Sequence, residues 1–163
     1  MDLINLLQRL GSTKNNGAEP EVPGQPITMY QREQRLNLLK TDAGNWISST
    51  ELHLQFAAEA NELPGMLFPR TLCIAHHPGS STSLMQMRSL LNRLQRTAPP
   101  GLHIIIVHAA GLPETVRREL FAMEDEIMSG AAALISNGTV ELSSAFGSKF
   151  EAFRTALQEK LLS

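Results

Sequence analysis

The sequence has only one cysteine, Cys73, so the chain cannot form an internal disulfide. Cys73 lies inside an apolar segment, Thr71-Leu-Cys-Ile-Ala, where a cysteine serves as a small core hydrophobe rather than as a reactive thiol. Nothing in the cysteine content therefore requires an oxidising compartment.

Long apolar runs are also missing, since none approaches the length needed to span a membrane. The first ten residues, Met-Asp-Leu-Ile-Asn-Leu-Leu-Gln-Arg-Leu, lack the basic start and the continuous apolar centre of a signal peptide. We therefore expect a cytoplasmic protein without membrane insertion.

Neither sign of charge is in large excess, because 14 basic and 16 acidic residues leave a net charge of −2. This balance argues against a general electrostatic attraction to nucleic acid or to an acidic membrane. Arg88, Arg93 and Arg96 lie on the polar side of an expected helix, without the interleaved aromatic residues that stack on bases. We expect no nucleic-acid partner, and any protein partner is expected to be recognised by shape.

The sequence lacks several motifs of known chemistry. It contains neither the Walker A nor the dinucleotide-binding glycine pattern, and no Gly-x-Ser-x-Gly elbow presents Ser80 as a nucleophile. His76 and His77 are consecutive in an extended segment and point to opposite faces, so they cannot jointly hold one metal ion. His77 and His108 are expected at the ends of adjacent strands, but two histidines without a third ligand fall short of a zinc site. We therefore expect no catalytic residue, no metal and no cofactor.

What the sequence does contain is a central β-α-β unit, on which the domain organisation rests. Thr71-Leu-Cys-Ile-Ala and Leu102-His-Ile-Ile-Ile-Val-His are continuous apolar runs, typical of parallel strands buried on both faces, and about 25 residues of helical period separate them. A chain of 163 residues is long enough for one sizeable core. We expect a single α/β domain over 29–163, with its core at 50–163.

Further elements are expected on both sides of this unit. Residues 29–40 are helical but polar, and their charges are interpreted as a solvated face. The other expected elements are a strand at 50–56, a short helix at 57–63, a helix opening at Leu112 with an apolar stripe to Met128, strands at 131–136 and 139–143 around the hairpin signal Asn137-Gly138, and a last helix announced by the capping box Ser148-x-x-Glu151.

Residues 1–28 are predicted to form a unit separate from the domain. Residues 1–11 predict an amphipathic helix ended by Gly11, and residues 12–28 have the proline and glycine content of a flexible linker. The helix has one apolar face, formed by Leu3, Leu6, Leu7 and Leu10. A lone helix of about ten residues is marginal in water, so it must dock either on a protein partner or on its own domain.

From residue 50 the expected order is β-α-β-α-β-α-β-β-α, ending in a strand, Asn-Gly, a second strand and a helix. This order resembles the thioredoxin-fold superfamily, a three-layer α/β sandwich, here with a helical N-terminal extension. A flavodoxin-like doubly wound sheet is the alternative, disfavoured because the Asn-Gly turn forces antiparallel pairing at the end.

The resemblance also implies what this chain has lost. Redox members of the superfamily carry Cys-x-x-Cys after the second strand, where this sequence has His77-Pro78-Gly79-Ser80. They also carry a proline, usually cis, before the hairpin, where this sequence has Gly130-Ala131-Ala132-Ala133. Because thiol-disulfide exchange requires a thiolate and a resolving partner, the resemblance implies a redox-inactive member.

One loop remains a candidate ligand site. The turn after the second strand opens a helix, so its backbone N–H groups and hydroxyls could bind a phosphate or carboxylate, with a histidine from the next strand opposite. The candidate ligand residues are His77, Gly79, Ser80, Ser81 and His108. Ser80 or Ser81 acting as an ordinary helix N-cap explains the same residues.

Two functions follow from these expectations. The preferred one is a non-catalytic interaction or assembly module, an adaptor that engages a protein partner through the N-terminal helix. The alternative is a small enzyme or sensor that binds an anionic ligand at the turn from His77 to Ser81.

Overall fold

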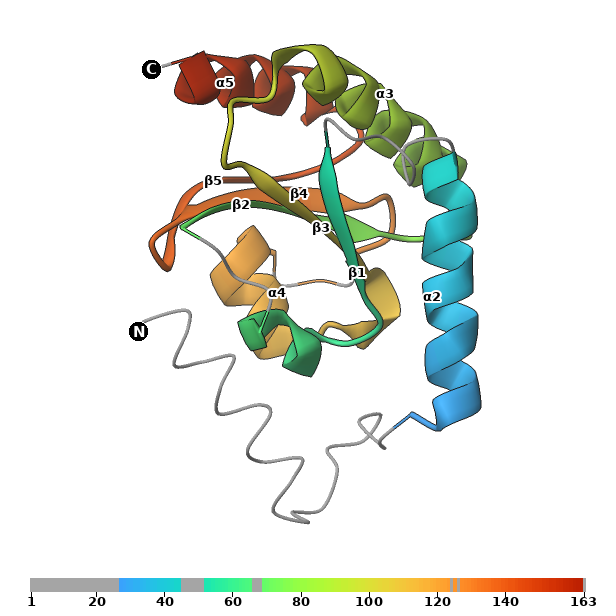
Figure 1. The fold of residues 1–163 in the computed structure, drawn as a ribbon. Helices are drawn as coiled ribbons and strands as arrows, with labels where there is room; N and C mark the ends of the chain where they lie inside the picture. The colour runs from blue at the N-terminus through green and yellow to red at the C-terminus, as the bar shows by residue number, and fades with distance from the viewer. Residues whose placement is uncertain (1–26, 45–51, 66–68, 124, 126, 163) are drawn as a thin grey trace.

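A computed structural model describes residues 27–44, 52–65, 69–123, 125 and 127–162. In these residues five strands form one mixed sheet in the order β1-β3-β2-β4-β5 (Figure 1). Three strands are mutually parallel, namely β1 (His53–Ala57), β2 (Arg70–His76) and β3 (His103–His108). The other two, β4 (Ala131–Ser136) and β5 (Thr139–Ala145), run antiparallel to β2 and to each other.

Helices cover both faces of this sheet. The α3 helix (Ser81–Thr97) and the α5 helix (Phe150–Leu162) lie on one face, and the α4 helix (Glu114–Phe121) and the short 3-10 helix η2 (Ala60–Gly65) lie on the other (Figure 1). The α2 helix (Met29–Ala43) runs beside β1 and β3. The predicted three-layer α/β sandwich is thus confirmed.

The two core layers follow from the alternation of side chains along the inner strands. Leu72 and Ile74 of β2 face α3 and α5, whereas Cys73 and Ala75 face α4, and all four are fully buried. Because both faces of β2 are covered, an uninterrupted apolar run was the correct signal for this strand. The prediction that Cys73 is a core residue is confirmed.

The hairpin forms where the sequence predicted it. Asn137 and Gly138 both have positive φ angles, 50° and 80°, as a two-residue turn of the primed type requires. The turn pairs β4 with β5 in antiparallel register, so the flavodoxin-like alternative does not hold.

Several element boundaries differ from the prediction. The helix expected to reach Met128 ends at Phe121, because Ala122 adopts the left-handed conformation, and Met128 is exposed. The short helix expected at 57–63 is the 3-10 helix η2, which begins later because β1 continues through Ala57. The last helix begins at Phe150, one residue later than the predicted capping box places it.

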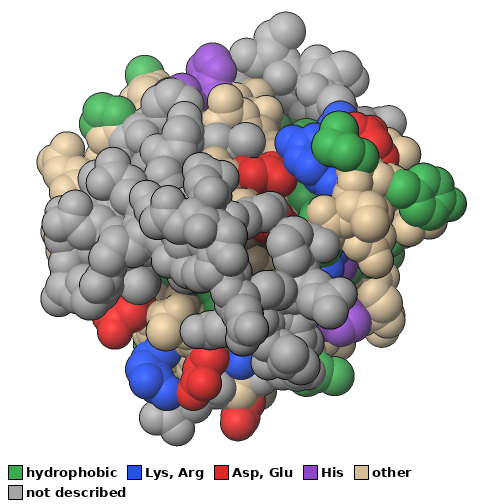
Figure 2. All heavy atoms as spheres, turned by 90° about the horizontal axis from the view of Figure 1, so that it is seen from below, with side chains coloured by type: hydrophobic (Ala, Val, Ile, Leu, Met, Phe, Trp, Pro, Cys, Tyr) green, Lys and Arg blue, Asp and Glu red, His purple; other side chains and the backbone are tan. Residues whose placement is uncertain are grey.

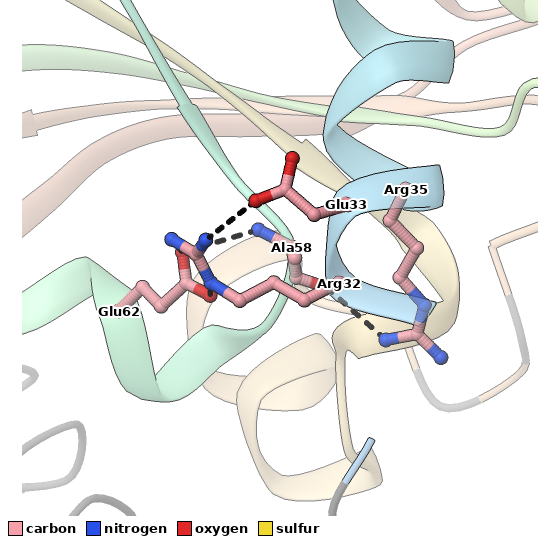
Figure 3. Close-up of polar contacts among 5 residues, drawn as sticks. All are labelled: Arg32, Glu33, Arg35, Ala58 and Glu62. Atoms are coloured by element: carbon pink, nitrogen blue, oxygen red, sulfur yellow. Dashed lines mark hydrogen bonds and ion pairs between the residues drawn. The ribbon is translucent and has the colours of Figure 1, made fainter. Parts of the chain in front are cut away.

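The charges of α2 were also misread, since two of its arginines attach the helix to the domain (Figure 3). Arg32 Nε donates to Glu62 Oε1 at 3.0 Å, and Arg35 Nη1 donates to the backbone oxygen of Ala58 at 3.2 Å. The N–H of Ala58 donates in turn to Glu62 Oε2 at 3.3 Å. These contacts fix α2 against the end of β1.

The predicted helix at 1–11, with Leu3, Leu6, Leu7 and Leu10, and almost all of the linker at 12–28 lie outside the described residues. Both stay predictions. Among the described residues, no helix has the length and apolar character needed to cross a membrane.

The structure predicts that Gly111 cannot be replaced by alanine without loss of stability. A Cβ atom added there would lie 2.2 Å from the backbone oxygen of Ala58 and 2.8 Å from the Cα of Glu59, so backbone would have to move. We expect Gly111→Ala to lower the free energy of unfolding by about 3 kcal/mol. Urea denaturation followed by circular dichroism measures this.

Gly79→Ala is the matched control, because the nearest atom to its added Cβ is Cε1 of the His77 side chain, at 3.3 Å. Its effect should stay below about 1 kcal/mol. Equal stabilities for the two variants would show that the close approach at Gly111 is absent.

Candidate functional site at the carboxyl ends of the central strands

The candidate site lies where β2 and β3 end. These strands are adjacent and parallel, and His76 and His108 are register partners at their carboxyl ends. The turn from His77 to Ser80 leads from β2 into α3. The two strand ends that the sequence analysis paired therefore do meet at one edge of the sheet.

Ser80 is the N-cap of α3. Its backbone is extended, and its Oγ accepts the N–H of Ser83 at 3.1 Å, while Ser81 is the first helical residue and is exposed. The capping interpretation therefore holds for Ser80. No ligand is needed to explain this hydroxyl.

The central feature of the site is a buried hydrogen-bond network that the sequence analysis missed. Nε2 of His76 lies 2.7 Å from Oδ2 of Asp42, and Nδ1 of His76 lies 2.8 Å from Oγ of Ser83. The same Oγ accepts the backbone N–H of His77 at 3.0 Å. The network joins the end of α2, the end of β2 and the first turn of α3.

The direction of each hydrogen bond follows from the chemistry of the groups. An ionised Asp42 can only accept, so Nε2 of His76 donates and carries the proton of a neutral ring. Nδ1 of His76 then accepts from the hydroxyl of Ser83. A neutral His76 therefore satisfies every group in the network, whereas a second ring proton would compete with the N–H of His77 for the oxygen of Ser83.

Ser83, His76 and Asp42 thus make the hydrogen bonds of a catalytic triad, but they lack access to a substrate. The side chains of His76 and Ser83 are both 0% exposed, and a nucleophile must reach the atom that it attacks. Gly130 packs closely against Ser83, because a Cβ atom added at Gly130 would lie 2.7 Å from Ser83 Oγ. The network can hold the fold together, but it cannot perform acyl transfer.

The surroundings keep two histidines neutral. Burial lowers the pKa of His76, against the opposing effect of its hydrogen bond to Asp42. Burial, followed by the positive charge of Arg35 and by the neighbouring histidines, lowers the pKa of His108 to about 4. His108 therefore brings no positive charge to this edge of the sheet at neutral pH.

The remaining candidate residues have local roles. Nδ1 of His108 accepts the N–H of Ala110 at 3.1 Å and caps the short 3-10 helix η3 (Ala109–Gly111). The His77 ring lies close to Gly79, and its Nδ1 is buried without a hydrogen-bond partner. Within the described ranges, no group of three or more His, Cys, Asp or Glu side chains could hold a metal ion.

Asp42 and Ser83 could not have been identified from sequence spacing. Asp42 lies 34 residues before His76, at the end of a helix that was interpreted as solvated, and only the fold brings the two together. Ser83 had a weak signal, since it lies three residues after the N-cap Ser80, on the side of α3 that turns toward the sheet.

Comparisons with known proteins identify the fold. No model of a known protein family matches the sequence, and no curated protein matches it. Among solved structures, the chain is similar to a mutant thioredoxin from Halobacterium salinarum NRC-1, with a TM-score of 0.50 and 9% sequence identity over 68% of this chain and 92% of that one. The chain has a thioredoxin fold.

A second solved structure, mitochondrial thioredoxin 3 from Saccharomyces cerevisiae in its oxidised form, aligns with a TM-score of 0.47 and 14% identity over 71% of this chain and 97% of that one. The fold rests on the first of these two similarities, and a sequence identity of 9% leaves the activity of the protein open.

This thioredoxin fold lacks the means for dithiol chemistry. The turn from His77 to Ser80 contains no cysteine, and Cys73 is the only cysteine in the sequence. Burial raises the pKa of Cys73 to about 12, so the thiolate needed for exchange is not formed at neutral pH. The residue that stands before β4 is Gly130, which has a φ angle of +90°.

The lowered pKa of His108 predicts that acid destabilises the protein. His108 is protonated less readily in the folded protein than in the unfolded chain. Its contribution to the free energy of unfolding is therefore fully present above pH 6.5 and is lost as the pH falls toward about 4. The His108→Gln variant has no imidazole to protonate at this position. Between pH 7 and pH 4.5 its free energy of unfolding should therefore fall by about 1–2 kcal/mol less than that of the unsubstituted protein, allowing for partial solvent screening.

Urea titrations of both proteins across this pH range measure the difference. Above pH 6.5 the two curves of stability against pH should run parallel. Curves that stay parallel down to pH 4.5 would mean that His108 is as easily protonated in the folded protein as in the unfolded chain.

Proposed function

We propose that this protein is a non-catalytic interaction or assembly module, an adaptor or accessory subunit built on a redox-inactive thioredoxin fold. The observation that supports it most strongly is the network of Asp42, His76 and Ser83. The residues beside the turn that carries the redox cysteines in other members are committed here to internal hydrogen bonds, and His76 and Ser83 are 0% exposed.

Two exposed methionines favour contact with another protein. Met85 is 71% exposed and Met128 is 61% exposed. Exposed methionines are adaptable apolar groups and are frequent at protein-binding surfaces.

The partner class follows from charge and from the N-terminal sequence. Acidic and basic side chains of the described residues are interspersed on the face shown in Figure 2, in keeping with the net charge of −2, so a protein partner is proposed rather than nucleic acid. The proposed docking element is the leucine face at 1–10, formed by Leu3, Leu6, Leu7 and Leu10. The proposed location is the cytoplasm.

A second candidate function is the binding of an anionic ligand at the turn from His77 to Ser81. One observation favours it, namely that Nδ1 of His77 is buried without a hydrogen-bond partner close to the amino terminus of α3. Against it, Ser80 Oγ is already used as a cap, and the low pKa of His108 leaves that ring uncharged at neutral pH.

Deleting residues 1–25 separates docking from stability. The deletion leaves Thr28, whose hydroxyl caps α2 by accepting the N–H of Gln31 at 3.1 Å. We expect the melting temperature to stay within a few degrees of the full chain, because a docking segment contributes little to the core. Capture of protein partners from native extract, quantified by mass spectrometry, should be lost.

The full-length variant Leu6→Asp with Leu7→Asp should behave as the deletion does, and Gln8→Asp on the same segment is the matched control that should retain capture. A melting temperature lowered by about ten degrees or more would place the segment in the core instead. Undiminished capture by the deletion would contradict the docking proposal. Stabilisation of the full chain by inorganic phosphate, lost in His77→Ala, would favour the anionic ligand.

A further inference from the structure

The sulfur-containing side chains of the described residues include fully buried and largely exposed ones. Cys73 and Met87 are both 0% exposed, and burial raises the pKa of the Cys73 thiol to about 12. Met29, Met85 and Met128 are 75%, 71% and 61% exposed. In this part of the chain, the sulfur atoms that a dissolved oxidant reaches most easily are therefore thioethers and not a thiolate.

Met85 and Met87 show this contrast within a single turn of α3. Side chains two residues apart on a helix point in directions that differ by about 200° around the helix axis. Met87 accordingly belongs to the core between the sheet and the helices α3 and α5. Met85 lies four residues after Ser81, the first residue of α3, and both are exposed. The Met85 thioether is thus one helical turn beyond the turn from His77 to Ser80.

A thioether reacts with a hydroperoxide without the help of a catalytic group. The sulfur lone pair attacks one peroxide oxygen, the O–O bond breaks and an S–O bond forms. The departing hydroxide takes the proton of the transferred oxygen and leaves as water, so the sulfur loses two electrons and the peroxide gains them. Cys73 competes poorly, because its reactive form is the thiolate and its side chain is buried.

We propose that Met85 is an oxidative modification site of this protein, at which a hydroperoxide converts the thioether into a sulfoxide while Met87 and Cys73 stay reduced. Met29 and Met128 share this reactivity, because they are exposed to a similar degree. The product replaces an adaptable apolar group on the surface of α3 by a polar one. This inference goes beyond the proposed function and does not depend on it.

Treatment of the full chain with dilute hydrogen peroxide at neutral pH, followed by peptide mass spectrometry, tests the site. Tryptic cleavage after Arg70 and Arg88 gives one peptide that contains Cys73, Met85 and Met87, so the three sulfur groups are compared within one molecule. We expect Met85 to gain an oxygen atom at least about tenfold faster than Met87, because a buried side chain reacts only in the small population of opened molecules. Cys73 should remain a free thiol.

The same treatment in denaturing urea is the control, because unfolding exposes both methionines and should make their oxidation rates nearly equal. Met85→Leu should abolish the fast oxidation of this peptide and leave Met87 reduced, and a thermal melt verifies that the variant is folded. Equal oxidation rates at Met85 and Met87 in the folded chain, an unreactive Met85, or oxidation of Cys73 before Met85 would overturn the proposal.

Discussion

The structure depends on one buried network, in which Asp42 accepts from His76 and His76 accepts from Ser83. A polar side chain without partners is costly in a core, and the network removes this cost for His76 and Ser83, both fully buried. It also joins α2, β2 and α3, three elements separated along the chain. Arg88 strengthens the same junction by donating from Nε to the backbone oxygen of Asp42 at 2.8 Å.

The network explains how a thioredoxin fold can persist without its chemistry. The carboxyl end of the second strand in a redox member must present a reactive thiol, which requires solvent access and a lowered pKa. Here the same end places His76 inside the protein and leaves the turn to Ser80, which caps α3. The position is occupied by groups that stabilise the fold.

The architecture could be predicted from the sequence where the residue pattern of a segment agreed with its place in the fold. The buried strands β2 and β3 were visible as continuous apolar runs, and Asn137-Gly138 identified the hairpin because few other residues adopt its positive φ angles. The end of α4 was missed because the apolar periodicity continues past Ala122. Alanine is not a residue type that indicates the left-handed conformation found there. Helix propensity does not predict the end of the helix here, because alanine has the highest propensity of all residues.

The candidate site was only partly predictable for a different physical reason. Adjacent strand ends follow from the β-α-β topology, so the meeting of the ends of β2 and β3 could be predicted, although His77 and not His76 was expected opposite His108. Asp42 could not, because its contact with His76 depends on how α2 packs, and that packing depends on Arg32 and Arg35 reaching Glu62 and Ala58. Such long-range polar contacts have no period along the sequence.

The network is a closed internal structure with a neutral His76. Long-range nitrogen-proton NMR of the histidine rings tests it directly, because the two ring nitrogens report the tautomer and the protonation state. We expect His76 to keep its proton on Nε2 at neutral pH and to titrate below 6.5, because burial lowers its pKa. A ring that carries its proton on Nδ1, or that titrates at 6.5 like an exposed histidine, would contradict it.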